Sequence, residues 1–467
     1  MDNSFASIKG IAISSRFEAA RRGMRATVDR YGATSAAVLA VLAVLWVLCP
    51  ACSKDENDCR DCNDAGPDAG PGDEAVWVSA GDTHTCAVID GGDVKCWGDQ
   101  QWGELGYGLD LDSLPGADLS LPSTSPFVNV GDPVAEILAG SAYTCALTEQ
   151  KSLRCWGWGS GGTLGVDVID PSGTIGLNDV PADYAPIDFG IAIQDFAVGG
   201  TATCVLLEGG NIVCFGTSQH GQLGYGGVAL GYNVNAPPNS DAVDLGGPAI
   251  QVSTGLDHTC AVLENGDVLC WGLGALLGYG DTDDVGDDEV PADVGPVDLG
   301  GPAVQVSCGD YHTCALLETG DVVCWGLGDY GMLGYGNTDS IGMTNVPANV
   351  GPVDVGGKVV QVAAGTRFTC ALLKTGDVKC WGIGSPALGY GNLENIGDDE
   401  VPADVAPVDV GGVVKQITTG MGHTCALLVS GKIVCWGDAS NGRLGYGSSG
   451  DIGDDETPAS VGPVQLF

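Results

Sequence analysis

Short apolar segments alternate with runs of glycine, proline and aspartate along most of the chain, from residue 76 to residue 467. Residues 303–326 are typical, because their aliphatic and β-branched runs are interrupted by Gly-Asp-Tyr-His and by Glu-Thr-Gly-Asp. Short runs of this kind bounded by turn residues predict β-strands. No stretch after residue 48 has the pattern of a long helix. The pattern therefore predicts an all-β protein.

Cysteine spacing shows that these segments are copies of one unit. Fourteen cysteines form pairs whose members lie ten residues apart, and the first members follow one another at intervals of 54 to 59 residues. A repeat of about 56 residues written seven times is typical of a repeat architecture. The expected pairs are Cys86–Cys96, Cys145–Cys155, Cys204–Cys214, Cys260–Cys270, Cys314–Cys324, Cys370–Cys380 and Cys425–Cys435.

Each pair is expected to bridge a β-hairpin. In the fifth unit, a three-residue loop at 318–320 places Cys314 opposite Cys324 on a non-hydrogen-bonded site, where Cα atoms are about 4.5 Å apart. That separation lies at the low end of the disulfide range, so we predict seven cross-strand bridges. The third loop residue favours a left-handed backbone and is glycine in six units. Lys151 replaces it in the second unit, where we expect a strained or altered turn.

Both faces of the predicted hairpins are apolar. In the fifth unit we expect Trp325 opposite Thr313 and diagonal to Ala315, so that a large ring lies beside small side chains. Sheets that are buried on both faces stack against neighbouring sheets, and seven sheets stacked in a ring form a β-propeller. An aromatic residue follows the second cysteine in every unit: Trp97, Trp156, Phe215, Trp271, Trp325, Trp381 and Trp436.

Three motifs recur in the units: His-Thr-Cys-Ala-Leu, as at 423–427, Gly-Asp-Val-x-Cys-Trp-Gly, and Gly-x-Leu-Gly-Tyr-Gly, as at 331–336. Through them, residues 76–467 resemble the repeats of the regulator-of-chromosome-condensation family, which implies a seven-bladed β-propeller. The match is weakest in the second unit, at Gly165-Val166, and in the fourth, where Ala275 replaces the first glycine. Founding members bind chromatin and promote nucleotide exchange on a small GTPase, whereas other relatives are secreted or serve as scaffolds. No loop motif here matches the exchange residues.

Composition indicates a compartment and argues against one class of partner. The chain has 18 basic and 60 acidic residues, a net charge of −42, which argues against a nucleic-acid partner. Its hydrophobic content of 44% is too high for a disordered chain, and its 76 glycines and 23 prolines argue against a helical bundle. Nineteen cysteines indicate an oxidising compartment.

The N-terminus has the pattern of an export signal. Residues 1–35 carry six basic residues, and an uninterrupted apolar run follows at 36–48. This run fits a signal core and is short for a membrane span. The following Ala51-Cys52 resembles the lipobox of bacterial lipoproteins, which implies acylation of Cys52. Because Cys49 stands where that family prefers leucine, an uncleaved anchor and plain secretion stay open as alternatives.

These features predict three parts: a signal peptide of lipoprotein type at 1–51, an acidic flexible tether at 52–75, and the propeller at 76–467. Residues 1–51 hold six basic and three acidic residues, so their removal leaves a net charge of −45. The tether lacks an apolar pattern. We expect Cys59 and Cys62 within it to form a small local disulfide, and Cys308, which has no partner in the repeat, to be a buried free thiol.

One position of the repeat is the first candidate for a metal or catalytic site. It lies two residues before the first cysteine and is occupied by His84, Tyr143, Ala202, His258, His312, Phe368 and His423. A position that accepts phenylalanine and alanine indicates packing rather than a metal ring. Because each cysteine is expected to be oxidised, the repeated His-Thr-Cys also offers no nucleophile.

Acidic loops form the second candidate, because clustered oxygens are what Ca²⁺ requires. The EF-hand pattern fails, since Val285 and Ala292 occupy ligand positions, and a sialidase Asp-box fails because Gly320 precedes Asp321. Solvated loop acids are therefore the favoured interpretation. The candidate Ca²⁺ ligands are Asp287, Asp288, Glu289, Asp398, Asp399, Glu400, Asp454, Asp455 and Glu456.

Loops that depart from the repeat are the third candidate. Residues 109–130 and 166–190 differ most from the shared pattern, and non-repeated loops are where ligand specificity can lie. A neutral insertion explains them equally well.

Together these observations predict a non-enzymatic, monomeric propeller that is exported and held to a bacterial cell envelope by lipid on Cys52. We expect it to bind an unknown protein or glycan ligand through blade loops, with no cofactor and no nucleic acid. A guanine-nucleotide exchange regulator is the first alternative and rests on fold-level resemblance. A surface module that binds Ca²⁺ or glycan is the second.

Overall fold

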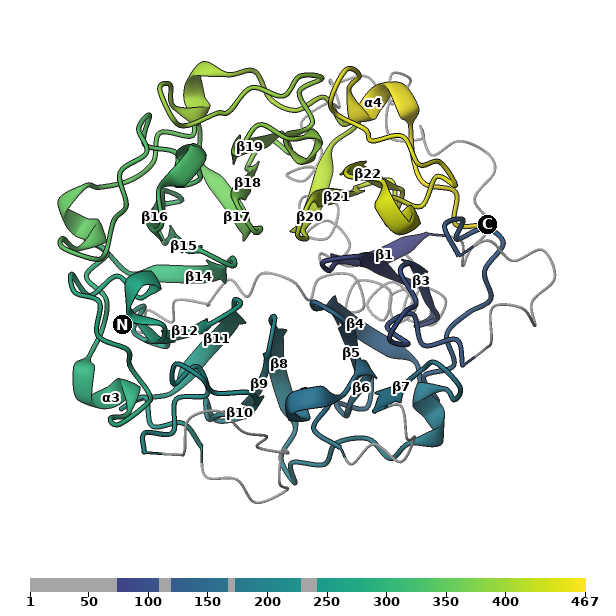
Figure 1. The fold of residues 1–467 in the computed structure, drawn as a ribbon, viewed down its shortest axis with the longest axis horizontal. Coiled ribbons are helices and arrows are strands. Elements are labelled where there is room, and N and C mark those ends of the chain that lie inside the picture. The colour runs from purple at the N-terminus through teal and green to yellow at the C-terminus, as the bar shows by residue number, and fades with distance from the viewer. Residues whose placement is uncertain (1–73, 109–118, 167–172, 228–241) are drawn as a thin grey trace, which may run out of the picture. The chain divides into compact units, whose positions relative to one another are not determined.

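A computed structural model describes residues 74–108, 119–166, 173–227 and 242–467. All of them belong to one compact unit, Ala69–Phe467. This unit contains seven antiparallel sheets arranged as blades around a common centre (Figure 1). The all-β class, the seven blades and the repeat of about 56 residues predicted from the sequence are thus confirmed. Within the described ranges, no helix is both long and apolar enough to cross a bilayer.

Three strands form the body of each blade, and consecutive strands pair. The inner strands, nearest the centre in Figure 1, are β1 (Ala75–Ala80), β4 (Val134–Ala139), β8 (Ile193–Val198), β11 (Ala249–Thr254), β14 (Ala303–Cys308), β17 (Val359–Ala364) and β20 (Val414–Thr419). The middle strands are β2 (His84–Ile89), β5 (Tyr143–Thr148), β9 (Ala202–Leu207), β12 (His258–Leu263), β15 (His312–Leu317), β18 (Phe368–Leu373) and β21 (His423–Leu428). The third strands are β3 (Val94–Gly98), β6 (Leu153–Trp158), β10 (Ile212–Gly216), β13 (Val268–Gly272), β16 (Val322–Gly326), β19 (Val378–Gly382) and β22 (Ile433–Gly437).

The outer edge of each blade is irregular. Among the described residues, only the second blade adds a fourth strand, β7 (Thr174–Ile175), and other blades hold single bridges such as Gly326 to Ile341. The helices among the described residues are one turn long: α3 (Pro291–Val294), α4 (Pro458–Val461), η2 (Ser160–Gly162), η3 (Pro181–Asp183), η4 (Gly274–Leu276), η5 (Asp329–Gly331), η6 (Pro347–Asn349), η7 (Pro386–Leu388), η8 (Pro402–Asp404) and η9 (Ser440–Gly442).

The hairpin between β15 and β16 has the register that the cysteine spacing predicts. Cys314 faces Cys324, and Thr313 faces Trp325. The loop is closed by hydrogen bonds from the Leu317 and Gly320 amides, and Gly320 has a φ of 81°. Every blade contains its expected disulfide, with Cα atoms 4.0–4.1 Å apart. The alternation of facing residues within one short hairpin is therefore enough to place both sulfur atoms.

The second blade keeps the same turn without the glycine. Lys151 has a φ of 64°, and its amide donates to the Thr148 carbonyl as Gly320 does to Leu317. The turn is therefore strained rather than altered, because the left-handed conformation costs roughly 1–2 kcal/mol for a residue with a Cβ atom.

The core lies between the blades. The rings that follow the second cysteines are fully buried, and each packs against the preceding blade. A Cβ atom at Gly278 in the fourth blade would meet the indole of Trp325 in the fifth, and one at Gly445 would meet Trp97 in the first. The seventh blade therefore packs on the first as every other blade packs on its successor, which closes the ring.

Side chains on the inner strands also bridge the blades. Gln251 accepts from the Val306 amide (2.8 Å) and donates to the Val306 carbonyl (3.0 Å) of the next inner strand. Gln305, Gln361 and Gln416 make the same paired contacts with Val362, Ile417 and Val78. Glu136 and Asp195 take the glutamine's place in the second and third blades.

Candidate functional site

The histidines of the repeat lie buried between blades. His84 Nε2 lies 2.7 Å from Oγ1 of Thr144 in the next blade, and this hydroxyl donates to the carbonyl of Glu104 at 2.8 Å. Because the threonine's only proton goes to that carbonyl, His84 must donate from Nε2. Burial lowers the pKa of His84 to about 3, so the imidazole is neutral. The same contact is made by His312 with Thr369, and by His423 with Thr85, which joins the seventh blade to the first.

Other residues at this position keep the packing role. Tyr143 donates to the Ala202 carbonyl at 2.8 Å and accepts from Thr203 at 3.0 Å, whereas Phe368 fills the space with its ring alone. The four histidines lie in four separate seams between blades. The position thus joins and packs blades, and the sequence could not show its threonine partner because that residue lies 55 to 60 positions further along or, for His423, 338 positions earlier.

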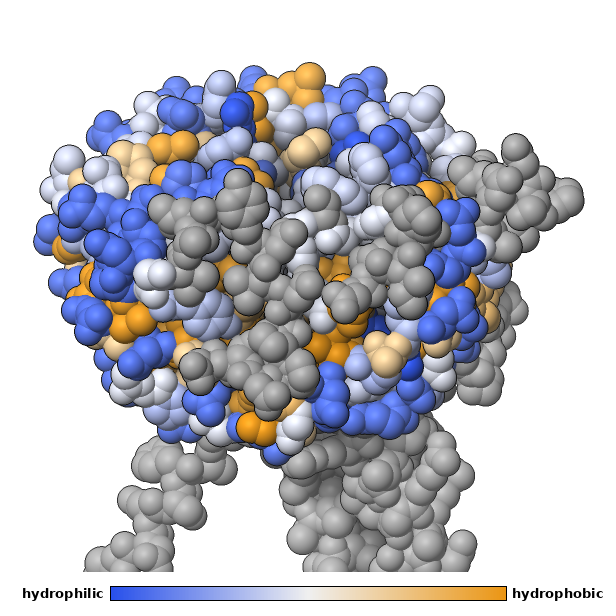
Figure 2. Space-filling model, turned by 60° about the horizontal axis from the view of Figure 1, so that its bottom comes forward, coloured by the Kyte–Doolittle hydropathy of each residue, from blue (hydrophilic) through white to orange (hydrophobic). Residues whose placement is uncertain are grey.

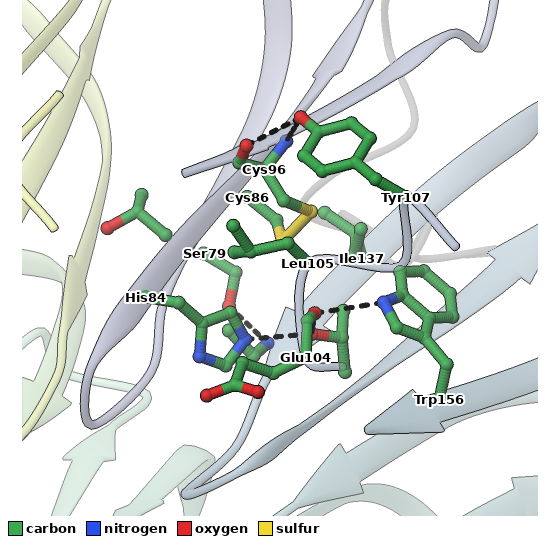
Figure 3. The surroundings of a disulfide bond; sticks show 12 residues. Ser79, His84, Cys86, Cys96, Glu104, Leu105, Tyr107, Ile137 and Trp156 are labelled. Atoms are coloured by element: carbon green, nitrogen blue, oxygen red, sulfur yellow. Dashed lines mark hydrogen bonds between the residues drawn. A yellow bond between two sulfur atoms is a disulfide. The ribbon is translucent and has the colours of Figure 1, made fainter. Parts of the chain in front are cut away.

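The tyrosine of the Gly-Tyr-Gly motif hydrogen-bonds to the backbone of the second cysteine of the disulfide. Tyr107 accepts from the Cys96 amide at 3.1 Å and donates to the Cys96 carbonyl at 2.6 Å (Figure 3). These backbone groups point away from Cys86, as expected on a non-hydrogen-bonded site of the hairpin. Figure 3 also shows the bridge beside Leu105 of the same unit and Ile137 of the next blade. In the second unit Val166 stands in place of the tyrosine.

Cys308 is the free thiol that the spacing predicts within the described ranges, and it is buried. Its sulfur donates to the Ser253 carbonyl at 3.4 Å, and burial raises its pKa to about 12. His258, Cys260 and Cys308 bring their ligand atoms within 4.8 Å of one another. Since Cys260 is bonded to Cys270, this group cannot bind a metal as a thiolate site. Cys52, Cys59 and Cys62 lie outside the described residues.

The acidic loops form three similar clusters. The carboxylates of each cluster lie within 4.8 Å of one another, and the middle acid of each is exposed. Burial and its acidic neighbours raise the pKa of Glu289 to about 7. Each cluster consists of three consecutive acids, whereas Ca²⁺ takes six to eight oxygens. The clusters are Asp287, Asp288 and Glu289; Asp398, Asp399 and Glu400; and Asp454, Asp455 and Glu456.

The described parts of the two unusual loops serve as blade edges. The Leu119 carbonyl accepts from Gly98 and the Val128 amide donates to Val94, so residues 119–130 form the edge of the first blade. Residues 173–190 include β7 and pair Ile187 with Leu153 in the second. Residues 109–118 and 167–172 lie outside the described residues.

One end of the ring, here called the loop face, concentrates the differences between units. It comprises the loops between inner and middle strands and the loops that follow the third strands, because antiparallel strands bring both to the same end. The acidic clusters lie on its outer part, since Ile396 and Ile452 pair with the glycines that end β19 and β22. The first set of loops comprises 81–83, 140–142, 199–201, 255–257, 309–311, 365–367 and 420–422.

An arginine and two tyrosines form a cluster on the loop face between the fifth and sixth blades. The Arg367 guanidinium lies 5.4 Å from the ring centroid of Tyr311 and 5.8 Å from that of Tyr330. Tyr330 is exposed and has a φ of 60°, a strained conformation of the kind that gathers at functional sites. Burial and the charge of Asp82 raise the pKa of the neighbouring Asp310 to about 6.

Two tryptophans form a second cluster between the first and second blades. Trp102 follows β3, Trp158 ends β6, and their ring centroids are 5.7 Å apart. They are 37% and 42% exposed, in contrast to the fully buried tryptophans of the core. Figure 2 shows hydrophilic residues over much of the visible surface, with hydrophobic residues in smaller patches. The sequence did not single out this pair, because their proximity depends on the packing of two blades.

Comparisons with known proteins support the fold and identify the family. A family model described as the regulator of chromosome condensation (RCC1) repeat matches residues 78–101, 249–276, 303–331 and 414–443, and a second RCC1 repeat model matches 265–316 and 319–372. The chain is 30% identical over 382 residues to the ultraviolet-B receptor UVR8 of Arabidopsis thaliana, covering 80% of this chain and 79% of that protein. The chain belongs to the RCC1 repeat family.

Other relatives and solved structures agree with this RCC1 assignment. The chain is 29% identical over 392 residues to the human E3 ubiquitin-protein ligase HERC2, covering 82% of this chain and 7% of that protein. Yeast RCC1 (Prp20), solved with Kap60, has a TM-score of 0.61 at 19% identity and covers 82% and 84% of the two chains. Human WBSCR16 has a TM-score of 0.57 at 20% identity and covers 73% and 83%.

Proposed function

We propose that this RCC1-repeat protein is an exported, non-enzymatic scaffold that binds a protein partner through its loop face. The observation that carries the proposal is the pair of aromatic clusters at the surface, Trp102 with Trp158 and the half-buried Tyr311 with Tyr330 and Arg367. Tryptophan, tyrosine and arginine are the residues most enriched at the energetic centres of protein interfaces. Both clusters bridge neighbouring blades on the end of the ring where the units differ.

The relatives support a binding role. UVR8 is named a receptor, and a solved structure of yeast Prp20p is described with its binding properties to Gsp1p and histones. The chain shares 19% identity with Prp20p, so this likeness concerns the fold alone. The proposal for this protein therefore rests on its own loop face, and the relatives show that RCC1-type rings are used for binding.

The proposed location rests on the N-terminal sequence and on the oxidised blades. We propose that 1–51 is a lipoprotein-type signal, that lipid on Cys52 anchors the protein in a bacterial cell envelope, and that 52–75 is a tether for the propeller 76–467. Seven disulfides favour an oxidising compartment. Metabolic labelling with a fatty-acid analogue should label the full chain and leave Cys52→Ala unlabelled. Labelling of Cys52→Ala, or recovery of the mature protein in the cytosol, would contradict the anchor.

The binding role is tested by crosslinking in intact cells, followed by capture of the full chain from envelope fractions. We expect a protein partner to be captured by the wild type and lost from Trp102→Ala/Trp158→Ala. Phe127→Ala is a matched control, since Phe127 is an exposed aromatic residue beside the start of β3, at the opposite end of the blade. No specific partner with the wild type, or equal capture by the double variant, would refute the proposal.

A further inference from the structure

The cluster between the fifth and sixth blades shows how the loop face binds a cation. Arg367 lies immediately before Phe368, in the loop that joins β17 and β18, and reaches the rings of Tyr311 and Tyr330 from the neighbouring blade. An aromatic face attracts a guanidinium within about 6 Å of its centroid. In this seam the chain supplies both the rings and the cation.

The seam between the first and second blades has the rings without that arginine. Trp102 immediately precedes Gly103, just as Tyr330 precedes Gly331, and Trp158 adds a second exposed ring. The residue at the position of Arg367 is Ala142, which immediately precedes Tyr143. Tryptophan is the best of the aromatic residues for cation–π contact. This seam therefore offers the stronger rings and a small uncharged residue where the other seam has its arginine.

Acidic groups lie beside the two tryptophans. Oε2 of Glu104 accepts from the Trp102 amide at 2.7 Å, while its Oε1 is buried and has no hydrogen-bond partner among the described residues. Asp99 lies in the same loop, and Asp82, in the loop that joins β1 and β2, accepts from Ser141 in the corresponding loop of the second blade. Burial raises the pKa of Glu104 to about 7, so this carboxyl is only partly ionised at neutral pH. The attraction for a cation between the tryptophans therefore comes from the acidic surroundings as a whole, and the contribution of Glu104 grows as pH rises through 7.

We propose that Trp102 and Trp158 bind an arginine or lysine side chain of a basic partner polypeptide, in the manner that Tyr330 and Tyr311 bind Arg367. This inference rests on the proposed binding function and names the chemistry of the partner. Charge selects that partner, because the exported chain carries a net charge of −45. A second copy of the chain, a nucleic acid and an anionic membrane would all be repelled, whereas a basic segment is attracted.

The test uses the full chain purified in mild detergent and a short synthetic peptide of alternating arginine and serine. The control peptide has citrulline, a neutral isostere, in place of arginine. We expect saturable quenching of tryptophan fluorescence by the arginine peptide at 0.15 M salt, and binding at least about threefold weaker for the citrulline peptide. Trp102→Ala and Trp158→Ala should each weaken binding by about three- to thirtyfold, the range of a cation–π contact.

Two further variants separate this site from the general acidity of the surface. Ala142→Arg should place a guanidinium of the chain between the tryptophans and abolish peptide binding without lowering the melting temperature. Phe127→Ala should leave peptide binding unchanged, because Phe127 lies at the opposite end of the blade and Lys95 of the chain already lies over its ring. Equal affinity for the two peptides, or unchanged binding by Ala142→Arg, would overturn the inference. If the cellular partner is still captured in that case, the binding function stands and only the cationic site fails.

Discussion

The histidine that four of the units carry before the first cysteine acts as a neutral donor that joins two blades. His312 is fully buried, and burial lowers its pKa to about 3, so the folded protein does not take up a proton there at mildly acidic pH. The unfolded chain does, because an unperturbed histidine has a pKa near 6.5. The unfolded state therefore binds more protons below that pH, and the free energy of unfolding falls as pH falls from about 6.5.

Phe368 suggests a substitution that removes this dependence. His312→Phe should cost about 1 kcal/mol of unfolding free energy at pH 8, because the bond to Thr369 is lost. Between pH 8 and pH 5, the free energy of unfolding should fall by about 2 kcal/mol less in the variant than in the wild type. Chemical denaturation at the two pH values measures both effects. If the unfolding free energy of the two proteins falls equally between pH 8 and pH 5, His312 takes up a proton in the folded protein.

Lys151, like Tyr330, has a left-handed backbone conformation that conflicts with its side chain. Glycine adopts a φ of 64° freely, although it adds flexibility to the unfolded chain. Lys151→Gly should therefore raise the free energy of unfolding by about 0.5–1 kcal/mol. The reciprocal change, Gly320→Lys, should lower it by a similar amount in the fifth blade. Calorimetry of the two variants measures both changes. If Lys151→Gly does not stabilise the protein, Lys151 makes a contact that compensates for the strain.

At the scale of elements, side chains join adjacent inner strands by hydrogen bonding to the backbone of the next blade. A glutamine can accept and donate at once, as Gln251 does with Val306. An ionised carboxylate can only accept. Asp195 accepts from Val252, and burial together with the charge of Glu136 raises its pKa to about 7, while Lys151 opposes that shift. Burial likewise raises the pKa of Glu136. The contacts between inner strands around the third blade are thus also sensitive to pH.

The direction of this effect is opposite to that of the histidines. Between about pH 4 and 7 the folded protein binds a proton at Asp195 that the unfolded chain lacks, so the contribution to stability is present at low pH and is lost as pH rises through 7. Asp195→Gln should gain about 1–2 kcal/mol over the wild type at pH 8 and much less at pH 5. Urea denaturation at both values tests this. A gain independent of pH would assign the effect to packing.

At the scale of the whole molecule, a ring of glycines closes the propeller at the loop face. A Cβ atom at any of these glycines would contact the carbonyl oxygen of the glycine in the next blade, and the seventh blade returns to the first. Each of them lies five residues before a first cysteine, a regularity of the sequence whose meaning appears only in the ring. The seven residues are Gly81, Gly140, Gly199, Gly255, Gly309, Gly365 and Gly420.

Gly309→Ala tests this closure. The added methyl group would overlap the Gly365 carbonyl, and we expect a loss of about 1–3 kcal/mol, the usual cost of overpacking. Gly301→Ala is the control, because its nearest atom would be a Leu317 methyl at 3.9 Å and its backbone is not left-handed. Thermal unfolding should separate the two variants by several degrees. Equal melting temperatures would show that the ring expands without strain.

Short-range features of the fold could be predicted in detail. The disulfides, the turn at Gly320 and the pairing of Trp325 with Thr313 all follow from alternation within a hairpin, so neighbouring residues are enough to fix them. The chemistry between blades could not be predicted in the same way. The His84–Thr144 bond joins residues 60 positions apart. Its partner is selected by how two sheets stack, which no local pattern encodes.

The sequence by itself determined the strands, the register of each hairpin, the number of blades and the acidic charge of the chain, because each depends on composition or on residues close along the chain. Only the tertiary structure decided which side chains meet across the seams. Trp102 and Trp158 lack the preceding cysteine of the buried tryptophans, but only the packing of two blades exposes them side by side. The exposure of a ring depends on what packs around it, and here those neighbours come from a different blade.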